Sequence, residues 1–90
     1  MVIWKYPLNI THRQLVAMPH DAQILSVAMQ KEILCLWAMV DPDEPFENRD
    51  IEIIGTGNKP PRGYGGSVHR NFIGTVVIDP FVWHVFERMN

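Results

Sequence analysis

The fold is decided by the stretch Ile24-Leu25-Ser26-Val27-Ala28-Met29-Gln30-Lys31-Glu32-Ile33-Leu34-Cys35-Leu36-Trp37-Ala38-Met39-Val40. Its first half alternates in the manner of a strand, with one face made of Leu25, Val27 and Met29. Its second half, residues 33–40, is apolar on both faces, which is typical of a central strand covered on both sides. The polar step at residues 30–32 predicts a tight hairpin between the halves, although it lacks the Asn-Gly signature.

The main alternative for this stretch is a helix within residues 21–40. Gln, Lys, Glu, Leu, Ala and Met favour that reading, and no proline interrupts it. Against it, the apolar residues do not form a stripe with a period of 3.6 residues, and Val, Ile, Cys and Trp are weak helix formers. We therefore expect strands here, with an α+β fold as the alternative.

The rest of the chain also reads as short strands separated by turns. We expect them at about residues 2–8, 11–18, 49–56, 71–79 and 81–88. Within them, Ile51 and Ile53 share one face, as do Phe81, Trp83 and Val85. Six or seven short strands predict a mainly β fold, an antiparallel sheet that curls into a sandwich or a partly open barrel.

Length and composition limit the class of protein. Ninety residues, 47% hydrophobic and 20% charged, indicate one globular domain over residues 1–90. The net charge of −2 does not favour general DNA binding, and the single cysteine excludes an intrachain disulfide framework. The longest apolar run, residues 33–40, is far shorter than the roughly 20 residues of a membrane span, and Lys5 and Pro7 interrupt any signal-peptide core. We expect a cytoplasmic protein without membrane contact.

A long Gly/Pro-rich loop, from about residue 55 to 70, is the first candidate site. It carries Lys59, Arg62 and Arg70 with His69 and no acid, and its glycines would let a ligand approach the backbone closely. Arginine holds phosphate in a bidentate way, and Tyr64 could stack on a base. This set predicts a site for a phosphate-bearing nucleotide, although neither the dinucleotide nor the phosphate-loop signature is met. The plainer interpretation is a polar connecting loop.

An acidic segment, residues 41–52, is the second candidate site. It holds six carboxylates against one arginine, a local charge of −5. Clustered acids suit a basic groove on another protein, and we name Asp41, Asp43, Glu44 and Glu47 as the contact residues. The plainer interpretation is a solvated loop. Calcium is not expected, because the Asp-x-Asp-x-Asp-Gly spacing is missing.

The remaining reactive side chains form no recognisable catalytic set. The four histidines lack the spacing of zinc ligands, and Ser26 and Ser67 lack a nucleophile elbow. Cys35 lies in an apolar strand and is expected to be an inert core thiol, and His84 a hydrogen-bonded histidine at the edge of the core. We therefore expect no enzyme activity, no metal and no cofactor.

Several segments together resemble a known group of proteins. They are Ile3-Trp4-Lys5-Tyr6-Pro7-Leu8, Met18-Pro19, Ile24-Leu25-Ser26-Val27, Leu36-Trp37-Ala38, Val40-Asp41-Pro42, Gly55-Thr56-Gly57, Ile73-Gly74-Thr75 and Trp83-His84-Val85-Phe86-Glu87. Over about residues 2–87 the chain resembles a family of small uncharacterised proteins of tailed phages and prophages. The resemblance implies a phage-type accessory protein working inside a bacterium. It assigns no functional residues.

Three hypotheses of function follow. The first is a non-enzymatic protein that binds and inhibits a bacterial host factor, such as part of a defence system. The second is a binder or sponge for a nucleotide, and the third is a minor structural protein of the virion. Because antiparallel sheets leave edge strands, we also expect the chain to pair as a homodimer.

Overall fold

The computed structural model describes residues 1–59 and 69–89 of the chain. Those residues form seven strands and no helix, so none of them belongs to a helix that could cross a membrane. The strands are β1 (Val2–Pro7), β2 (Arg13–Pro19), β3 (Gln23–Gln30), β4 (Ile33–Val40), β5 (Phe46–Gly55), β6 (His69–Ile78) and β7 (Phe81–Met89).

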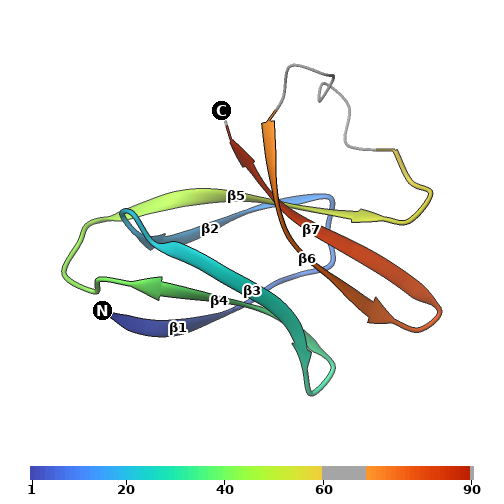
Figure 1. The fold of residues 1–90 in the computed structure, drawn as a ribbon, viewed down its shortest axis with the longest axis horizontal. Helices are drawn as coiled ribbons and strands as arrows, with labels where there is room; N and C mark the ends of the chain where they lie inside the picture. The colour runs from blue at the N-terminus through green and yellow to red at the C-terminus, as the bar shows by residue number, and fades with distance from the viewer. Residues whose placement is uncertain (60–68, 90) are drawn as a thin grey trace.

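The strands make two sheets, and every pairing between neighbours is antiparallel (Figure 1). The smaller sheet has the order β1-β4-β3, and the larger has the order β2-β5-β7-β6. The sheets are not closed into a barrel and are consistent with a sandwich, so the prediction of a mainly β fold is confirmed. The helical alternative for residues 21–40 is wrong, because this stretch forms the hairpin of β3 and β4.

The hairpin turn between β3 and β4 consists of Lys31 and Glu32, since Gln30 pairs with Ile33. Both turn residues have positive φ, 48° for Lys31 and 68° for Glu32. Two positive φ angles are what a two-residue turn needs to follow the right-handed twist of its strands. The turn type is therefore imposed by the strands, without the Asn-Gly pair that would adopt it most easily.

The core lies between the sheets and is made of one face of each strand. The smaller sheet contributes Leu34, Leu36, Ala38 and Val40 of β4. The larger sheet contributes Ile51 and Ile53 of β5 and Val85 of β7, as their alternation predicted. One face assignment is wrong. The register shifts between Ile24 and Ser26, so Ile24 packs against the core with Val27 and Met29, whereas Leu25 is exposed.

The acidic segment is not one loop. β5 begins at Phe46, three residues earlier than expected, so Glu47 belongs to a strand together with Asp50 and Glu52, which were expected in one. At its other end β5 stops at Gly55, and β6 already begins at His69, so His69 and Arg70 lie in a strand and not in a loop. The alternation of Ile51 and Ile53 into the core explains why a charged sequence continues as a strand here.

Candidate functional site

The outer side of β4 is the most unusual surface of the smaller sheet. Because Leu34, Leu36 and Ala38 face the core, the alternate residues Ile33, Cys35, Trp37 and Met39 face outward. Across the sheet Ile3 pairs with Met39 and Lys5 with Trp37, so they share this side. We call the outward side chains of Ile3, Lys5, Ile33, Cys35, Trp37 and Met39 the outer sheet face.

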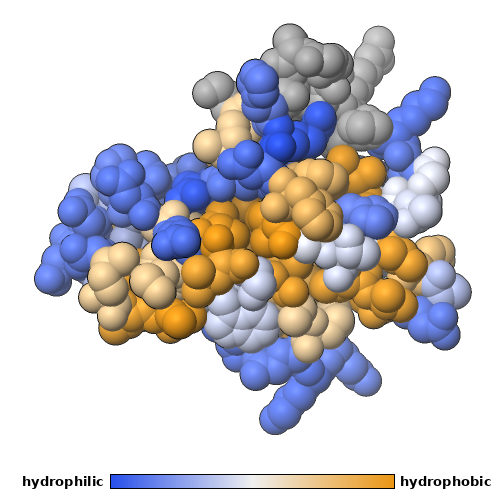
Figure 2. Space-filling view, viewed as in Figure 1, coloured by the Kyte–Doolittle hydropathy of each residue, from blue (hydrophilic) through white to orange (hydrophobic). Residues whose placement is uncertain are grey.

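Apart from Lys5, the outer sheet face is apolar on β1 and β4, whereas Gln23, Ser26 and Gln30 flank it on β3. Ile3 is 56% and Ile33 is 52% exposed, and Trp37 and Met39 are half-buried. The expectation that residues 33–40 are covered on both sides is therefore met on one side only. In Figure 2, hydrophobic side chains spread across the middle of the molecule, where Figure 1 places β3, β4, β6 and β7, and hydrophilic side chains lie around its margin.

One contact crosses the outer sheet face. Lys5 Nζ on β1 donates a hydrogen bond of 2.7 Å to Gln30 Oε1 on β3. Cys35 of β4, the strand between them, is only 1% exposed, and its Sγ lies 3.6 Å from the carbonyl oxygen of Ile33. The cysteine is thus buried, as expected, but on the outward side of β4 and outside the main core cluster.

The predicted acidic contact residues gather at the end of the molecule where β4 runs into β5. Asp41 Oδ1 accepts a hydrogen bond from the backbone of Asp43 at 3.0 Å, and its carbonyl accepts one from the backbone of Glu44 at 3.1 Å. These bonds hold a tight turn in which Asp43 and Glu44 are exposed. We call residues 41–44 the acidic turn. It begins two residues after Met39, so it borders the outer sheet face.

Glu47, the fourth predicted contact residue, lies on β5 and faces the turn between β2 and β3. Its Oε2 lies 2.9 Å from Nδ1 of His20. The hydrogen bond to Glu47, together with the charge of Asp21, raises the pKa of His20. The same hydrogen bond lowers the pKa of Glu47. The carboxylates at this end of the molecule therefore favour the protonated form of His20.

The predicted phosphate-binding residues are only partly within the described chain. Arg62 and Tyr64 lie outside it, and Lys59 and His69 are exposed. The Nε of Arg70 donates a hydrogen bond of 2.7 Å to Oε1 of Glu52, whose side chain is 0% exposed. Arg70 therefore has a structural ion pair across the sheet, and the nucleotide site stays a prediction.

Two more ion pairs cross the larger sheet. Arg13 Nε of β2 donates a 2.8 Å hydrogen bond to Asp50, and Arg49 Nη2 of β5 donates one of 2.9 Å to Glu87 of β7. Arg49 also donates to the carbonyl oxygen of Ala22 at 2.7 Å. Two carboxylates of the acidic segment, Asp50 and Glu52, thus have arginine partners from outside it, so the segment is less acidic than its local charge of −5 indicates. The unpaired acids of that segment are concentrated in the acidic turn.

His84 is hydrogen-bonded on both sides of its ring. Its Nε2 lies 2.7 Å from Thr56 Oγ1, and its Nδ1 lies 3.0 Å from Thr75 Oγ1. The expected hydrogen-bonded histidine is confirmed, but with two threonines that the sequence pattern did not indicate. In the part of the chain that the structure describes, no three His, Cys, Asp or Glu side chains gather as metal ligands do.

Sequence reasoning named the acidic turn but missed the outer sheet face. Its signal was present, because residues 33–40 lack the polar alternation of a strand with one solvated side. From the sequence alone, the pattern instead predicts that other parts of the chain cover both sides of this strand.

Comparisons with known proteins identify the family of the chain and nothing closer. No curated protein and no solved structure matches it. A domain of unknown function, DUF7352, matches residues 1–90, and the chain belongs to that family.

Proposed function

We propose that this protein is a non-enzymatic binding protein that acts by direct contact with another protein through the outer sheet face. The observation that carries the proposal is β4, which is apolar on both sides and partly exposed on its outward side. Ile3, Ile33, Trp37 and Met39 leave apolar surface together on one sheet. Such gathered exposure is typical of protein-contact surfaces, whereas single exposed apolar residues are ordinary.

The acidic turn indicates the chemistry of the partner. Asp41, Asp43 and Glu44 border the apolar surface and form no ion pair with another described residue. A complementary partner presents an apolar centre with basic side chains along one rim. The apolar centre would supply most of the affinity, and the charged rim would set the orientation and speed association.

The resemblance to proteins of tailed phages and prophages supports a bacterial host factor as that partner. We propose that the contact inhibits this factor, for example a component of a defence system, in the cytoplasm of the host. The chain would act as a competitor for a surface that the host factor uses itself. This mode of action needs no catalytic residue in the chain.

The apolar contact is tested by capture from bacterial lysate with matched variants. Immobilised wild-type protein is expected to retain a specific host protein, and an Ile3→Ser/Ile33→Ser variant is expected to lose it. The control is Leu15→Ser, because Leu15 is similarly exposed but lies on the larger sheet. Equal capture by all three proteins would overturn the proposed surface, and melting temperatures confirm that each variant is folded.

The charged rim is tested separately by reversing Asp43 and Glu44 to lysine. We expect weaker capture and a weaker dependence of capture on salt, because the long-range attraction is removed. The control is Glu32→Lys at the hairpin turn, which changes charge at the opposite end of β4. An effect of the control as large as that of the double reversal would count against the acidic turn.

A second copy of the chain is the competing occupant of the outer sheet face. Sedimentation of the wild type at several concentrations separates the two cases. A dimer that Ile3→Ser/Ile33→Ser converts into a monomer would mean that the face joins two copies, and the proposal of a host partner at this face would be wrong. A monomer that still captures a host protein agrees with the proposal.

A further inference from the structure

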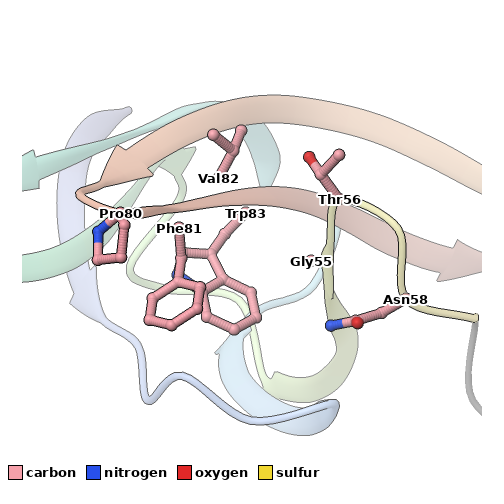
Figure 3. A pocket seen from close by; sticks show the side chains of 7 residues that line it. All are labelled: Gly55, Thr56, Asn58, Pro80, Phe81, Val82 and Trp83. Carbon is pink, nitrogen blue, oxygen red and sulfur yellow. The ribbon is translucent and has the colours of Figure 1, made fainter.

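A pocket of about 390 Å³ lies at the end of the larger sheet, where β5 stops and β7 begins. Its aromatic wall is formed by Phe81 and Trp83, whose ring centroids are 5.9 Å apart with the planes tilted by 43°. Figure 3 shows both rings on one side of β7, with the side chains of Thr56 and Val82 directed to the other side. The volume falls within the usual range of small-molecule sites, about 300–1,000 Å³.

Gly55 keeps this pocket open. A Cβ atom at Gly55 would stand 2.6 Å from Nδ2 of Asn58 and 3.1 Å from the ring of Trp83. Any larger residue would therefore displace the carboxamide or the indole. The following turn fixes Asn58, because its backbone N–H donates a 3.0 Å hydrogen bond to the carbonyl oxygen of Gly55, and Gly57 between them has a φ of 84°.

Asn58 is the polar side chain that this pocket offers to a ligand. The hydroxyl of Thr56 is already engaged with His84 at 2.7 Å. The carboxamide of Asn58 makes no hydrogen bond to a described residue, and it has both donors and an acceptor to offer. The described lining residues are all uncharged, so they provide no charged partner for a phosphate or a carboxylate.

We propose that this pocket binds a neutral sugar ring of a carbohydrate. The faces of aromatic rings carry partial negative charge, which attracts the partly positive C–H groups on the face of a pyranose, and that contact also buries apolar surface. The hydroxyl groups on the rim of the sugar can both donate to and accept from Asn58. Two rings tilted by 43° can contact a puckered ring from two directions, and they do not form a parallel-sided slot around a planar nucleobase.

Phe81 is accessible to a ligand, because the residue is 61% exposed at the start of β7. Trp83 also lines a smaller hollow of about 150 Å³ with Thr11 and His12. A second sugar unit next to the first would meet hydroxyl and imidazole groups there. This pocket is separate from the outer sheet face. A negative result for sugar binding would therefore not affect the proposal of protein contact, and the reverse also holds.

The test is titration of the 90-residue protein with glucose, galactose, mannose, N-acetylglucosamine, maltose and cellobiose, monitored by amide NMR shifts. We expect at least one sugar to bind with a Kd on the order of 1 mM, with shifts concentrated at residues 55–58 and 81–83. Phe81→Ala is expected to weaken this binding about tenfold. Phe72→Ala is the matched control, because Phe72 is 60% exposed and also contacts one ring, that of Phe86 at 5.4 Å.

Asn58→Ala provides a second variant in case Phe81→Ala does not fold. It is expected to weaken binding without lowering the melting temperature, since the exposed side chain bonds to no described residue. Absence of shifts with every sugar would overturn the proposal. So would equal binding by wild type and both variants, or shifts at these residues with adenosine or uridine and with none of the sugars.

Discussion

Gly74 of β6 lies against Val27 of β3, so close that a Cβ atom on the glycine would stand 2.9 Å from Cγ2 of the valine. These two strands are edges of different sheets. The register of β6 against β7 shifts between Phe72 and Gly74, so the strand bends at the point of contact. The absence of a side chain at Gly74 thus lets the two sheets meet at this corner.

Gly74→Ala is therefore expected to destabilise the protein by about 1–3 kcal/mol, because the branched side chain of Val27 cannot move aside easily. Urea unfolding measures the change. The control is the double variant Val27→Ala/Gly74→Ala, in which the methyl group has room. Its loss should be smaller than the sum of the two single losses, and strict additivity would contradict the contact.

In the hairpin turn between β3 and β4, a substitution is expected to stabilise the protein. Lys31 and Glu32 both occupy the left-handed region, which costs roughly 1–2 kcal/mol for each residue with a side chain. The double variant Lys31→Asn/Glu32→Gly should raise the free energy of unfolding by about 1–2 kcal/mol, since an Asn-Gly pair adopts the turn with less strain.

The matched control for that change is Glu44→Gly, in another turn but without a positive φ. We expect it to be neutral or slightly destabilising, because glycine adds freedom to the unfolded chain there. The denaturant midpoints of the two variants, each compared with that of the wild type, show whether the hairpin turn is strained. A hairpin variant that is no more stable than the wild type would show that Lys31 and Glu32 are not strained.

The strands could be predicted from the sequence because their signal is local. Alternation placed Ile51, Ile53 and Val85 on the core side, and all three are buried there. The bulge beside Leu25 could not be predicted, since it depends on how β3 pairs with β4 and not on the residues of β3 alone. The early start of β5 has the same origin, because residues 46–48 are held in the strand by pairing with β2.

The candidate site was harder to predict because several carboxylates are neutralised by arginines that are distant in the sequence. Asp50, Glu52 and Glu87 have arginine partners that are 37, 18 and 38 residues away in the sequence. A local sum of charges counts those carboxylates as free. Asp41, Asp43 and Glu44 lie in a turn between strands, as the sequence pattern indicated, and their role in protein contact stays a prediction.

The ion pair of Glu52 and Arg70 can be used to test how burial affects the stability lost when an ion pair is broken. Arg70→Met removes the partner of a carboxylate that is fully buried, which should cost about 3–5 kcal/mol. Arg13→Met removes the partner of Asp50 from a pair whose arginine side chain is 44% exposed, and should cost about 1 kcal/mol or less. Chemical denaturation of both variants gives the comparison, and equal losses would contradict the difference in burial.

A compensating variant separates charge from packing at the same place. In Glu52→Leu/Arg70→Met no buried charge is left without a partner, so most of the stability lost in Arg70→Met should return. If the double variant were less stable than Arg70→Met, hydrogen bonding by Glu52 itself would be the larger contribution.

The contact of His20 and Glu47 predicts how stability depends on pH. Because the pKa of His20 is raised in the folded state, its contribution is complete below the unfolded value of 6.5 and is lost as pH rises through the folded pKa. Because the pKa of Glu47 is lowered, its contribution is present above the unfolded value of 4.5 and is lost as pH falls through the folded pKa. The pair should therefore stabilise the fold most between pH 4.5 and pH 6.5. Melting temperatures of wild type and His20→Gln across this range measure it. The difference should shrink toward pH 8 and in about 1 M salt, since both side chains are partly exposed and the pair is screened. A difference that is constant with pH would show that His20 acts through packing and not through its charge.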